Sequence, residues 1–239
     1  MKLNIFSYRF AEEITQHPRH GNAWNEISEI LTAAPLFVYP NKSSKKASLD
    51  VVQQVMNTYF DRVMVLDHGW EFHPLATSIQ GSGLKADYRK SFGDLTIQAE
   101  VQFGNMSRWY SDVFKFQTAY SQSMIKMGLS IIPMGNLARR IDSNIVNFER
   151  AKRELPSAEL SLTLPILMIG LDQDEQTKVV DISQCQFGSI KEITGKGHSE
   201  NQWRIVNGYL QGAPMSEIGP HSPVGRSLID PLGDDSEEC

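Results

Sequence analysis

The residues Leu95-Thr-Ile-Gln-Ala-Glu-Val-Gln-Phe103 alternate between apolar and polar side chains. A period of two is typical of a β-strand that has one apolar face. Glu100 and Gln102 therefore share the opposite, polar face of this strand. Asp87 precedes the strand by a short hairpin, so an acid near the end of one strand stands next to an acid in the middle of its neighbour. The sequence predicts two carboxylates at one edge of a sheet.

The segments on both sides of this strand indicate further helices and strands. Apolar residues at spacings of three and four predict helices over residues 22–34, 48–65, 107–127 and 143–155. Two apolar runs, residues 129–134 and 162–170, are typical of buried strands. Strands that alternate with helices predict an α/β fold, in which helices flank a mixed central sheet on both sides.

Length and composition indicate a single domain over residues 1–239. We expect its core at residues 1–172 and an additional C-terminal region at residues 173–225, where only residues 203–210 suggest a short element. The acidic tail, residues 226–239, is expected to be disordered. Five of the 28 acids lie in the last ten residues, and without them 23 acids face 23 Lys and Arg. The rest of the chain can therefore carry a basic face despite the net charge of -5.

Several classes of protein are disfavoured by the residues that the chain lacks. Cys185 and Cys239 are too few for a disulfide framework or a zinc site, and no apolar run is long enough to span a membrane. This composition predicts a cytoplasmic protein. The six His are scattered, and the motifs of serine hydrolases, P-loop NTPases and dinucleotide-binding oxidoreductases are absent from the sequence.

The predicted carboxylate pair suits a hard divalent cation. Mg²⁺ prefers oxygen ligands, and a bound cation offsets the charge of a phosphodiester. Asp94 is an alternative to Asp87 as the first acid, although its place after Gly93 is typical of a turn. From the residues alone, an ordinary solvated sheet face is the other interpretation of Glu100 and Gln102.

Several segments of the chain together resemble a known family. They are Ala11-Glu-Glu-Ile14, Trp24-Asn-Glu-Ile-Ser-Glu-Ile30, Glu100-Val-Gln-Phe-Gly-Asn105, Ile131-Ile-Pro-Met134, Asp142-Ser-Asn-Ile-Val-Asn-Phe-Glu149 and Pro165-Ile-Leu-Met-Ile-Gly170. In order and spacing they resemble the type II restriction endonucleases of the BglII and BstYI group, and more distantly BamHI, in the PD-(D/E)xK nuclease superfamily. The resemblance covers residues 1–172.

The resemblance implies a catalytic site of Asp87, Glu100 and Gln102. Asp87 and Glu100 would hold Mg²⁺ with the help of the Val101 carbonyl, and Gln102 stands where Lys is usual but where BglII-like enzymes also carry Gln. The interval from Asp87 to Glu100 is longer than in the BglII and BstYI enzymes. An amide cannot accept a proton near neutral pH, so Gln102 can orient the attacking water but cannot be its general base. We predict that Gln102→Lys retains some activity, whereas Glu100→Ala abolishes cleavage and leaves binding.

The charge distribution and the resemblance also suggest DNA contacts. The candidates are Lys42, Lys45 and Lys46 in a Ser-rich loop, Asn105 and Ser107 after the strand, and Arg139, Arg140, Asp142, Ser143 and Asn144 further along the chain. In the resembling enzymes the start of the helix expected over residues 143–155 reads bases in the major groove, and Asn and Asp suit adenine and cytosine. The other interpretations are a solubilising loop for the lysines and a helix cap for Asp142 or Ser143.

These inferences predict a sequence-specific endonuclease that acts on double-stranded DNA. By resemblance it would be a homodimer that cuts a palindromic site containing GATC and leaves staggered ends with 5′-phosphates. Two alternatives remain open, a repair-type or less specific nuclease of the same fold and a catalytically silent DNA-binding protein. The aromatic residues of the helix expected over residues 107–127 are expected to form core or a dimer surface.

Overall fold

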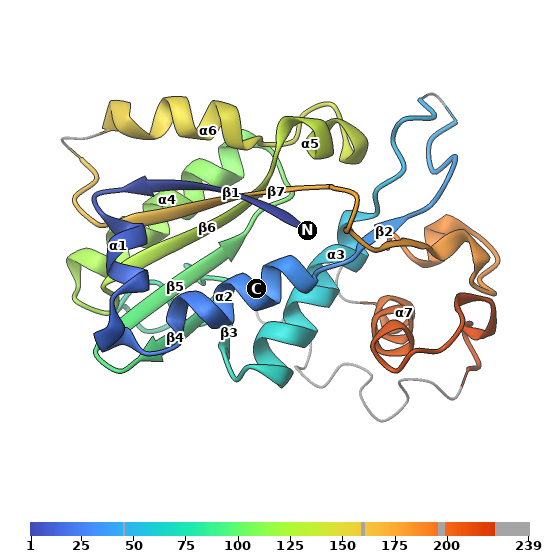
Figure 1. The fold of residues 1–239 in the computed structure, drawn as a ribbon, viewed down its shortest axis with the longest axis horizontal. Coiled ribbons are helices and arrows are strands. Elements are labelled where there is room, and N and C mark those ends of the chain that lie inside the picture. The colour runs from blue at the N-terminus through green and yellow to red at the C-terminus, as the bar shows by residue number, and fades with distance from the viewer. Residues whose placement is uncertain (45, 159–160, 196–198, 223–239) are drawn as a thin grey trace. The chain divides into compact units, whose positions relative to one another are not determined.

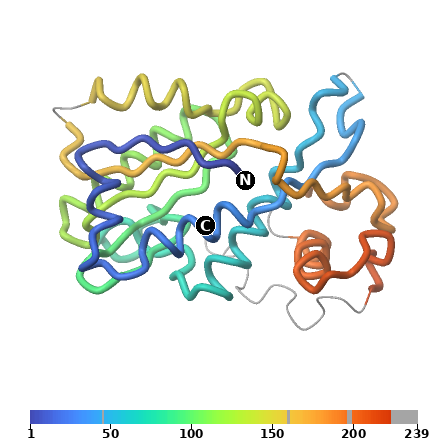
Figure 2. The backbone as a smooth tube through the Cα atoms, in the orientation of Figure 1, coloured from blue at the N-terminus to red at the C-terminus, as the bar shows by residue number. Residues whose placement is uncertain are grey.

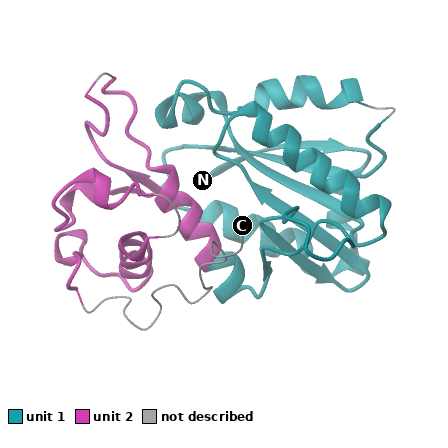
Figure 3. Cartoon of the chain, turned by 180° about the vertical axis from the view of Figure 1, so that it is seen from behind, with its two compact units in different colours: residues 1–34, 63–177 teal, residues 35–62, 178–239 magenta. Residues whose placement is uncertain are grey.

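The computed structural model describes residues 1–44, 46–158, 161–195 and 199–222 of the chain. The chain divides into two compact units, residues 1–34 with 63–177 and residues 35–62 with 178–239 (Figure 3). Lys45 and the acidic tail over residues 226–239 lie outside the described residues. The single domain expected from the sequence stays a prediction.

The first unit is built on a mixed sheet of six strands, which confirms the expected fold class (Figure 1). In their order across the sheet, the strands are β1 (Lys2–Tyr8), β7 (Ile166–Asp172), β6 (Met127–Pro133), β5 (Leu95–Val101), β4 (Tyr88–Phe92) and β3 (Glu71–Phe72). β5 pairs in parallel with β6, and β6 with β7, whereas the other neighbours are antiparallel. The path of the chain brings β1, drawn in blue, beside β7, drawn in orange (Figure 2).

Helices cover both faces of this sheet, as the sequence predicts. On one face lie α1 (Ala11–Gln16) and α2 (Ala23–Ala33), and the hydroxyl of Thr15 in α1 lies 3.3 Å from the sulfur of Met127. On the other face lie α4 (Met106–Ser121) and α6 (Phe148–Glu154). The indole N–H of Trp109 in α4 donates to Ser130 Oγ at 3.1 Å. Since β5 aligns Glu100 with Ser130, Glu100 lies on the face covered by α4.

A glycine in β6 allows α4 to approach the sheet closely. A Cβ atom on Gly128 would lie 2.8 Å from the ring of Phe116, a distance that carbon atoms in proteins do not tolerate. Phe116 is fully buried between the helix and the sheet. The absence of a side chain at Gly128 therefore lets α4 pack against β6, and it brings other side chains of α4 within reach of β5.

Two helices of the first unit differ from the expectation. α4 ends at Ser121 rather than at residue 127, because Ser123 adopts a left-handed conformation with a φ of 58°. The helix expected over residues 143–155 begins only at Phe148, so the predicted start was wrong. It is preceded by α5 (Gly135–Ile141), which the sequence analysis does not predict.

The described part of the second unit contains a two-stranded parallel sheet and two α-helices. β2 (Leu36–Val38) pairs with β8 (Val179–Asp181), and α3 (Gln53–Phe60) packs against α7 (Glu200–Leu210). Thr58 of α3 donates to Gln202 Oε1 of α7 at 3.2 Å. α7 confirms the short element suggested at residues 203–210.

Several short helices complete the described structure. The helix expected over residues 48–65 consists of α3 and a π-helical continuation, η2 (Asp61–Asp67). The 3-10 helices are η1 (Pro18–His20), η3 (Leu155–Ala158), η4 (Ile182–Gln184), η5 (Ile190–Glu192) and η6 (Met215–Glu217). None of the described helices combines the length and apolar character that crossing a membrane requires.

Candidate active site

The hairpin of β4 and β5 brings Asp87 and Glu100 together. Tyr88 pairs with Ala99, so Asp87, which immediately precedes β4, lies across from Glu100. The main-chain N–H of Val101 donates to Asp87 Oδ2 at 2.8 Å and holds this carboxylate beside the end of β5. The two acids singled out in the sequence are therefore neighbours, and their catalytic roles stay predictions.

Glu100 is buried although it belongs to the polar face of its strand. Its side chain is 1% exposed, and Gln98 and Ser130 on the same face are buried as well. Because α4 covers this face, the interpretation of Glu100 as part of a solvated sheet face is wrong. Glu100 Oε1 has no hydrogen-bond partner among the described residues. A buried carboxylate oxygen without a partner is costly, so this atom indicates a position for a ligand.

Two side chains of α4 extend to the carboxylates. Lys115 Nζ lies 2.9 Å from Glu100 Oε2 and 2.9 Å from Asp112 Oδ1. Asp112 is buried, and its other oxygen accepts from Gln102 Nε2 at 2.7 Å. The ammonium group therefore bridges one acid of the strand and one acid of the helix.

Neither Asp112 nor Lys115 is among the site residues predicted from the sequence. A signal for Asp112 was present, because this acid lies three residues after Trp109 and four before Phe116. Residues at these spacings share one face of a helix. An acid on the buried face of a helix rich in aromatic residues indicates that another polar or charged side chain lies against it.

Burial and like charges perturb the titration of this cluster. Burial raises the pKa of Glu100 well above its ordinary value, and the charges of Asp87 and Asp112 raise it further, against the opposing effect of Lys115. Burial also raises the pKa of Asp112. Burial alone would lower the pKa of Lys115, but the two carboxylates that it contacts raise it above its ordinary value. Glu100 and Asp112 thus share the ammonium group of Lys115, and the charge of Asp87 acts on Glu100 in addition.

The amide of Gln102 has one orientation. The main-chain N–H of Gly104 donates to Gln102 Oε1 at 2.7 Å, whereas Nε2 donates to Asp112. Because a main-chain N–H can only donate, this contact identifies the oxygen side of the amide. A Cβ atom on Gly104 would lie 2.5 Å from Gln102 Oε1, so the contact requires glycine. The second N–H of Nε2 is the group that can donate to a water molecule.

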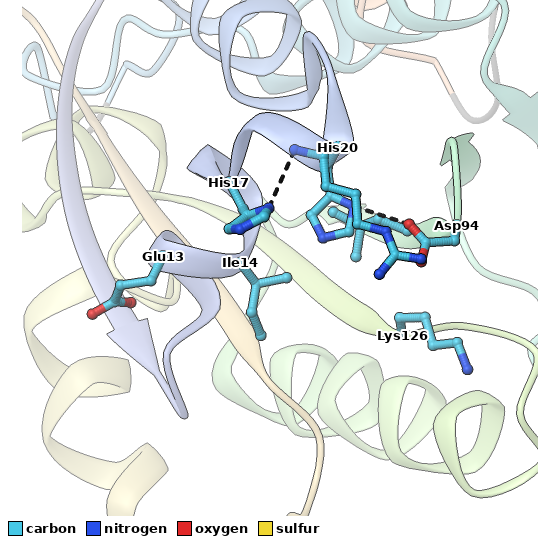
Figure 4. Close-up of a pocket in the computed structure, with 8 residues that line it drawn as sticks. Glu13, Ile14, His17, His20, Asp94 and Lys126 are labelled. Carbon is cyan, nitrogen blue, oxygen red and sulfur yellow. Dashed lines mark hydrogen bonds and ion pairs between the residues drawn. The ribbon is translucent and has the colours of Figure 1, made fainter.

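Asp94, the alternative first acid, lies at the other end of β5. It pairs with Arg19 at 2.8 Å and with His20 at 3.3 Å. Figure 4 shows Asp94 and His20 directed toward each other at a pocket of about 550 Å³. Glu100 is six residues further along the chain, about 20 Å at the usual rise of a strand, so the two acids cannot share one cation. The geometry favours Asp87.

The oxygen atoms near Glu100 fit a hard divalent cation. Glu100 Oε1 lacks a partner in the described chain, and Asp87 supplies a second carboxylate beside it. Within the described residues, no three His, Cys, Asp or Glu side chains are grouped closely enough to hold a metal ion. Mg²⁺ commonly binds through one or two carboxylates and keeps several waters, so a pair of acids with the Val101 carbonyl is an adequate donor set.

Main-chain hydrogen bonds join a candidate DNA-binding segment to the end of β5. Asn105 caps α4 and forms a β-bridge with Ile145. The N–H of Val146 donates to the carbonyl of Gly104 at 2.8 Å. The segment with the candidate base-reading residues 142–144 is therefore attached next to the carboxylates.

The candidates Asp142, Ser143 and Asn144 belong to a loop between α5 and α6. The prediction that they begin a helix is wrong, and so is the alternative that Asp142 or Ser143 is its N-cap. The N-cap of α6 is Asn147, whose side chain accepts from a main-chain N–H at 3.0 Å. Asp142 and Ser143 line a pocket of about 360 Å³ together with Arg139. All three residues of the loop are exposed, as a contact with DNA requires.

The remaining candidates lie apart from this loop or in the second unit. Arg140 pairs with the side chain of Gln173 at a different pocket, and Ser107 is exposed in the first turn of α4. Lys42, whose ammonium donates to a main-chain carbonyl, and Lys46, which is exposed, belong to the second unit. Their contacts with DNA stay predictions.

The aromatic residues of α4 divide between the core and the surface. Trp109 and Phe116 are buried, whereas Tyr110 and Phe114 are 46% and 62% exposed. The hydroxyl of Tyr110 pairs with Glu154 of α6. One face of α4 therefore builds the site, and another presents aromatic rings to the surface.

Comparison with known proteins identifies similar folds. A model of the restriction endonuclease BglII/BglIII family matches residues 3–171. The crystal structure of restriction endonuclease BglII complexed with a DNA 16-mer has a TM-score of 0.59 and 23% sequence identity, over 74% of this chain and 81% of that chain. Free BglII has a TM-score of 0.50 and 22% identity, over 74% of this chain and 82% of that chain. No curated protein sequence matches the chain.

Proposed function

Because this chain belongs to the restriction endonuclease BglII/BglIII family, we propose that it is a type II restriction endonuclease that cuts double-stranded DNA with Mg²⁺ as its cofactor. It hydrolyses one phosphodiester in each strand and leaves staggered ends with 5′-phosphates, at a palindromic site that contains GATC. We expect it to act in the cytoplasm, within a restriction-modification system.

One observation carries the proposal of a metal-dependent reaction: Glu100 is buried under α4 while its Oε1 lacks a partner in the described structure. Such an oxygen costs free energy unless a ligand satisfies it. Asp87 and Glu100, with the Val101 carbonyl, would hold Mg²⁺. When bound, this ion offsets the charge of the scissile phosphate and lowers the pKa of a water ligand.

Gln102 orients the attacking water and does not deprotonate it. Its amide cannot take up a proton near neutral pH. Its oxygen accepts from Gly104 and one N–H is directed to Asp112, so the second N–H donates to the water oxygen. A bound metal ion would lower the pKa of the water, or a phosphate oxygen of the substrate would take up its proton.

The loop between α5 and α6 reads the bases. Asn144 is the type of residue that pairs with adenine, and Asp142 is the type that accepts from the amino group of cytosine. Arg139, which shares a pocket with Asp142 and Ser143, contacts a phosphate and sets the position of the loop on the DNA. Further candidate contacts are Lys42, Lys45, Lys46, Asn105, Ser107 and Arg140.

Two copies of the chain act together on one site. A palindromic sequence presents two scissile phosphates that are related by a two-fold axis, and a homodimer matches this symmetry. The exposed rings of Tyr110 and Phe114 support an interaction of α4 with a second copy.

Cleavage of a plasmid of known sequence tests the proposal. The purified full chain is incubated with the plasmid in Mg²⁺ or in EDTA, and the ends of the products are sequenced. Discrete fragments with a common staggered end, formed only in Mg²⁺ and absent with Glu100→Ala, are the expected result. A smear of products would identify a less specific nuclease, and a shift of the DNA on a gel without any product would identify a silent binding protein.

A further inference from the structure

We propose that Lys115 is a positioning residue of the active site, whose ammonium group holds one oxygen of Glu100 and competes electrostatically with the divalent cation for this carboxylate. The inference rests on the proposed metal-dependent function. It assigns a role to a helix residue outside the strand motif.

The geometry gives Lys115 a defined place in the site. Its Nζ contacts Glu100 Oε2 and Asp112 Oδ1 at 2.9 Å each, and its side chain is 17% exposed. The opposite oxygen, Glu100 Oε1, is the one without a partner in the described structure. The ammonium group thus occupies one side of the carboxylate and leaves the other side to a ligand.

The same contact extends to the residue proposed to orient water. Lys115 binds one oxygen of Asp112, and the other oxygen accepts from Gln102. Gln102 is in turn fixed by the N–H of Gly104. Lys115 therefore positions a metal-binding carboxylate directly and the water-orienting amide through Asp112.

A positive charge at this distance also affects the affinity for a cation. A divalent ion held by Glu100 would share this carboxylate with the ammonium group of Lys115, so the two positive charges would repel each other. Water screens such a repulsion weakly when the groups are buried. Removal of the charge should therefore tighten binding of the ion, whereas loss of a purely structural contact would weaken it.

The test is a calorimetric titration of the full chain with Mn²⁺, without DNA. It is carried out at pH 8.5 for every variant, so that all of them are compared at one proton concentration. The variants are Lys115→Met, which removes the charge at similar length, and Lys115→Gln, which retains a hydrogen-bond donor if the apolar variant fails to fold. Lys115→Arg retains the charge. Lys126→Met removes a lysine that directly precedes β6, away from Glu100, and is the control for net charge.

We expect both neutral variants to bind Mn²⁺ about tenfold more tightly, an estimate from the Coulomb energy at partly screened sites. Lys115→Arg and Lys126→Met should bind as the unaltered chain does. Unchanged or weaker binding by the neutral variants overturns the role of Lys115, provided that Glu100→Gln abolishes binding. If Glu100→Gln leaves Mn²⁺ binding intact, the proposed metal site itself is wrong, and this outcome is distinct from the first.

Discussion

The two ends of β5 each carry an acid that pairs with a basic side chain. At one end Asp94 pairs with Arg19 at 2.8 Å, and at the other Glu100 pairs with Lys115 at 2.9 Å. The distances are nearly equal, but the side chain of Asp94 is 53% exposed and that of Glu100 is 1% exposed. The exposed pair is screened by water and contributes little to stability, whereas the buried acid has a raised pKa and an oxygen without a partner in the described chain.

This comparison shows that distance alone does not identify a functional ion pair. A buried acid whose oxygens are not all paired does identify one. An apolar residue at the position of Glu100 would be better for folding, so the presence of the acid indicates a function. Variants at each end of β5 test this difference separately.

The largest effect is expected for Glu100→Ala. Loss of the proposed metal ligand should remove several kcal/mol of transition-state stabilisation, which corresponds to a decrease in cleavage rate of about a thousandfold or more. Binding of a duplex that contains the site should persist, because the loop proposed to read the bases is unaltered. Cleavage and gel-shift assays on the same preparation measure the two properties, and near-normal cleavage by this variant would contradict the assignment.

A strong dependence on pH is expected next. Because burial raises the pKa of Glu100, this acid takes up a proton at a higher pH than an exposed Glu does, and the protonated form is a poor metal ligand. At Mg²⁺ concentrations well below saturation, cleavage should therefore decrease as the pH falls through the raised pKa, by about tenfold per unit for a single group. Rates measured at constant ionic strength from pH 9 to pH 5 test this, and a profile that is flat down to the range of an ordinary Glu would contradict it.

The same shift has an opposite effect on the stability of the metal-free chain. The folded state binds the proton of Glu100 more tightly than the unfolded state does, so this contribution is complete below the ordinary pKa of a glutamate and is lost as the pH rises through the folded-state pKa. The free energy of unfolding in EDTA should therefore increase on acidification from neutral pH. Glu100→Gln should flatten that dependence.

A moderate effect is expected for Gln102→Lys. The new ammonium group can donate to Asp112 as the amide does, but it lacks an acceptor for the N–H of Gly104. We expect the variant to retain activity within about a hundredfold of the unaltered chain, since one neutral hydrogen bond and its unsatisfied partner are worth a few kcal/mol at most. Complete loss of cleavage in a folded variant would show that the orientation of Gln102 is indispensable.

The smallest effect is expected for Asp94→Asn at the exposed end of β5. Its pair with Arg19 is screened, so the free energy of unfolding should change by less than about 1 kcal/mol. Cleavage rates should be unchanged, because the variant lies far from Glu100. A large loss of cleavage would reopen Asp94 as the first metal-binding acid.

Much of the fold could be predicted because β5 and its neighbours have periodic sequences. The alternation that begins at Leu95 appears as a strand, and the family match over residues 3–171 confirms the resemblance inferred from scattered motifs. α5 was not predicted, since a helix of seven residues that begins with Gly135 has a short apolar pattern. The predicted end of α4 was wrong, because nothing in the composition of residues 122–127 indicates the left-handed conformation of Ser123.

Only the part of the candidate site that lies on adjacent segments of the chain could be predicted from the sequence. Asp87 and Glu100 are joined by one hairpin, so strand geometry alone made them neighbours. Asp112 and Lys115 come from a helix that packs over the strand, and their contact with Glu100 depends on how α4 is rotated about its axis. That rotation is set by the packing of Phe116 on Gly128, which a pattern of spacings does not contain.

The contact between Gly128 and Phe116 has a consequence for the chemistry of the strand beside it. Phe116 follows Lys115 directly, so the depth to which the ring sinks toward β6 sets how far the ammonium nitrogen extends over Glu100. A methyl group at Gly128 would raise the helix by a fraction of an ångström, and that displacement is enough to lengthen a contact of 2.9 Å. The distance between α4 and the sheet therefore determines how closely the ammonium group of Lys115 approaches the buried carboxylate of Glu100.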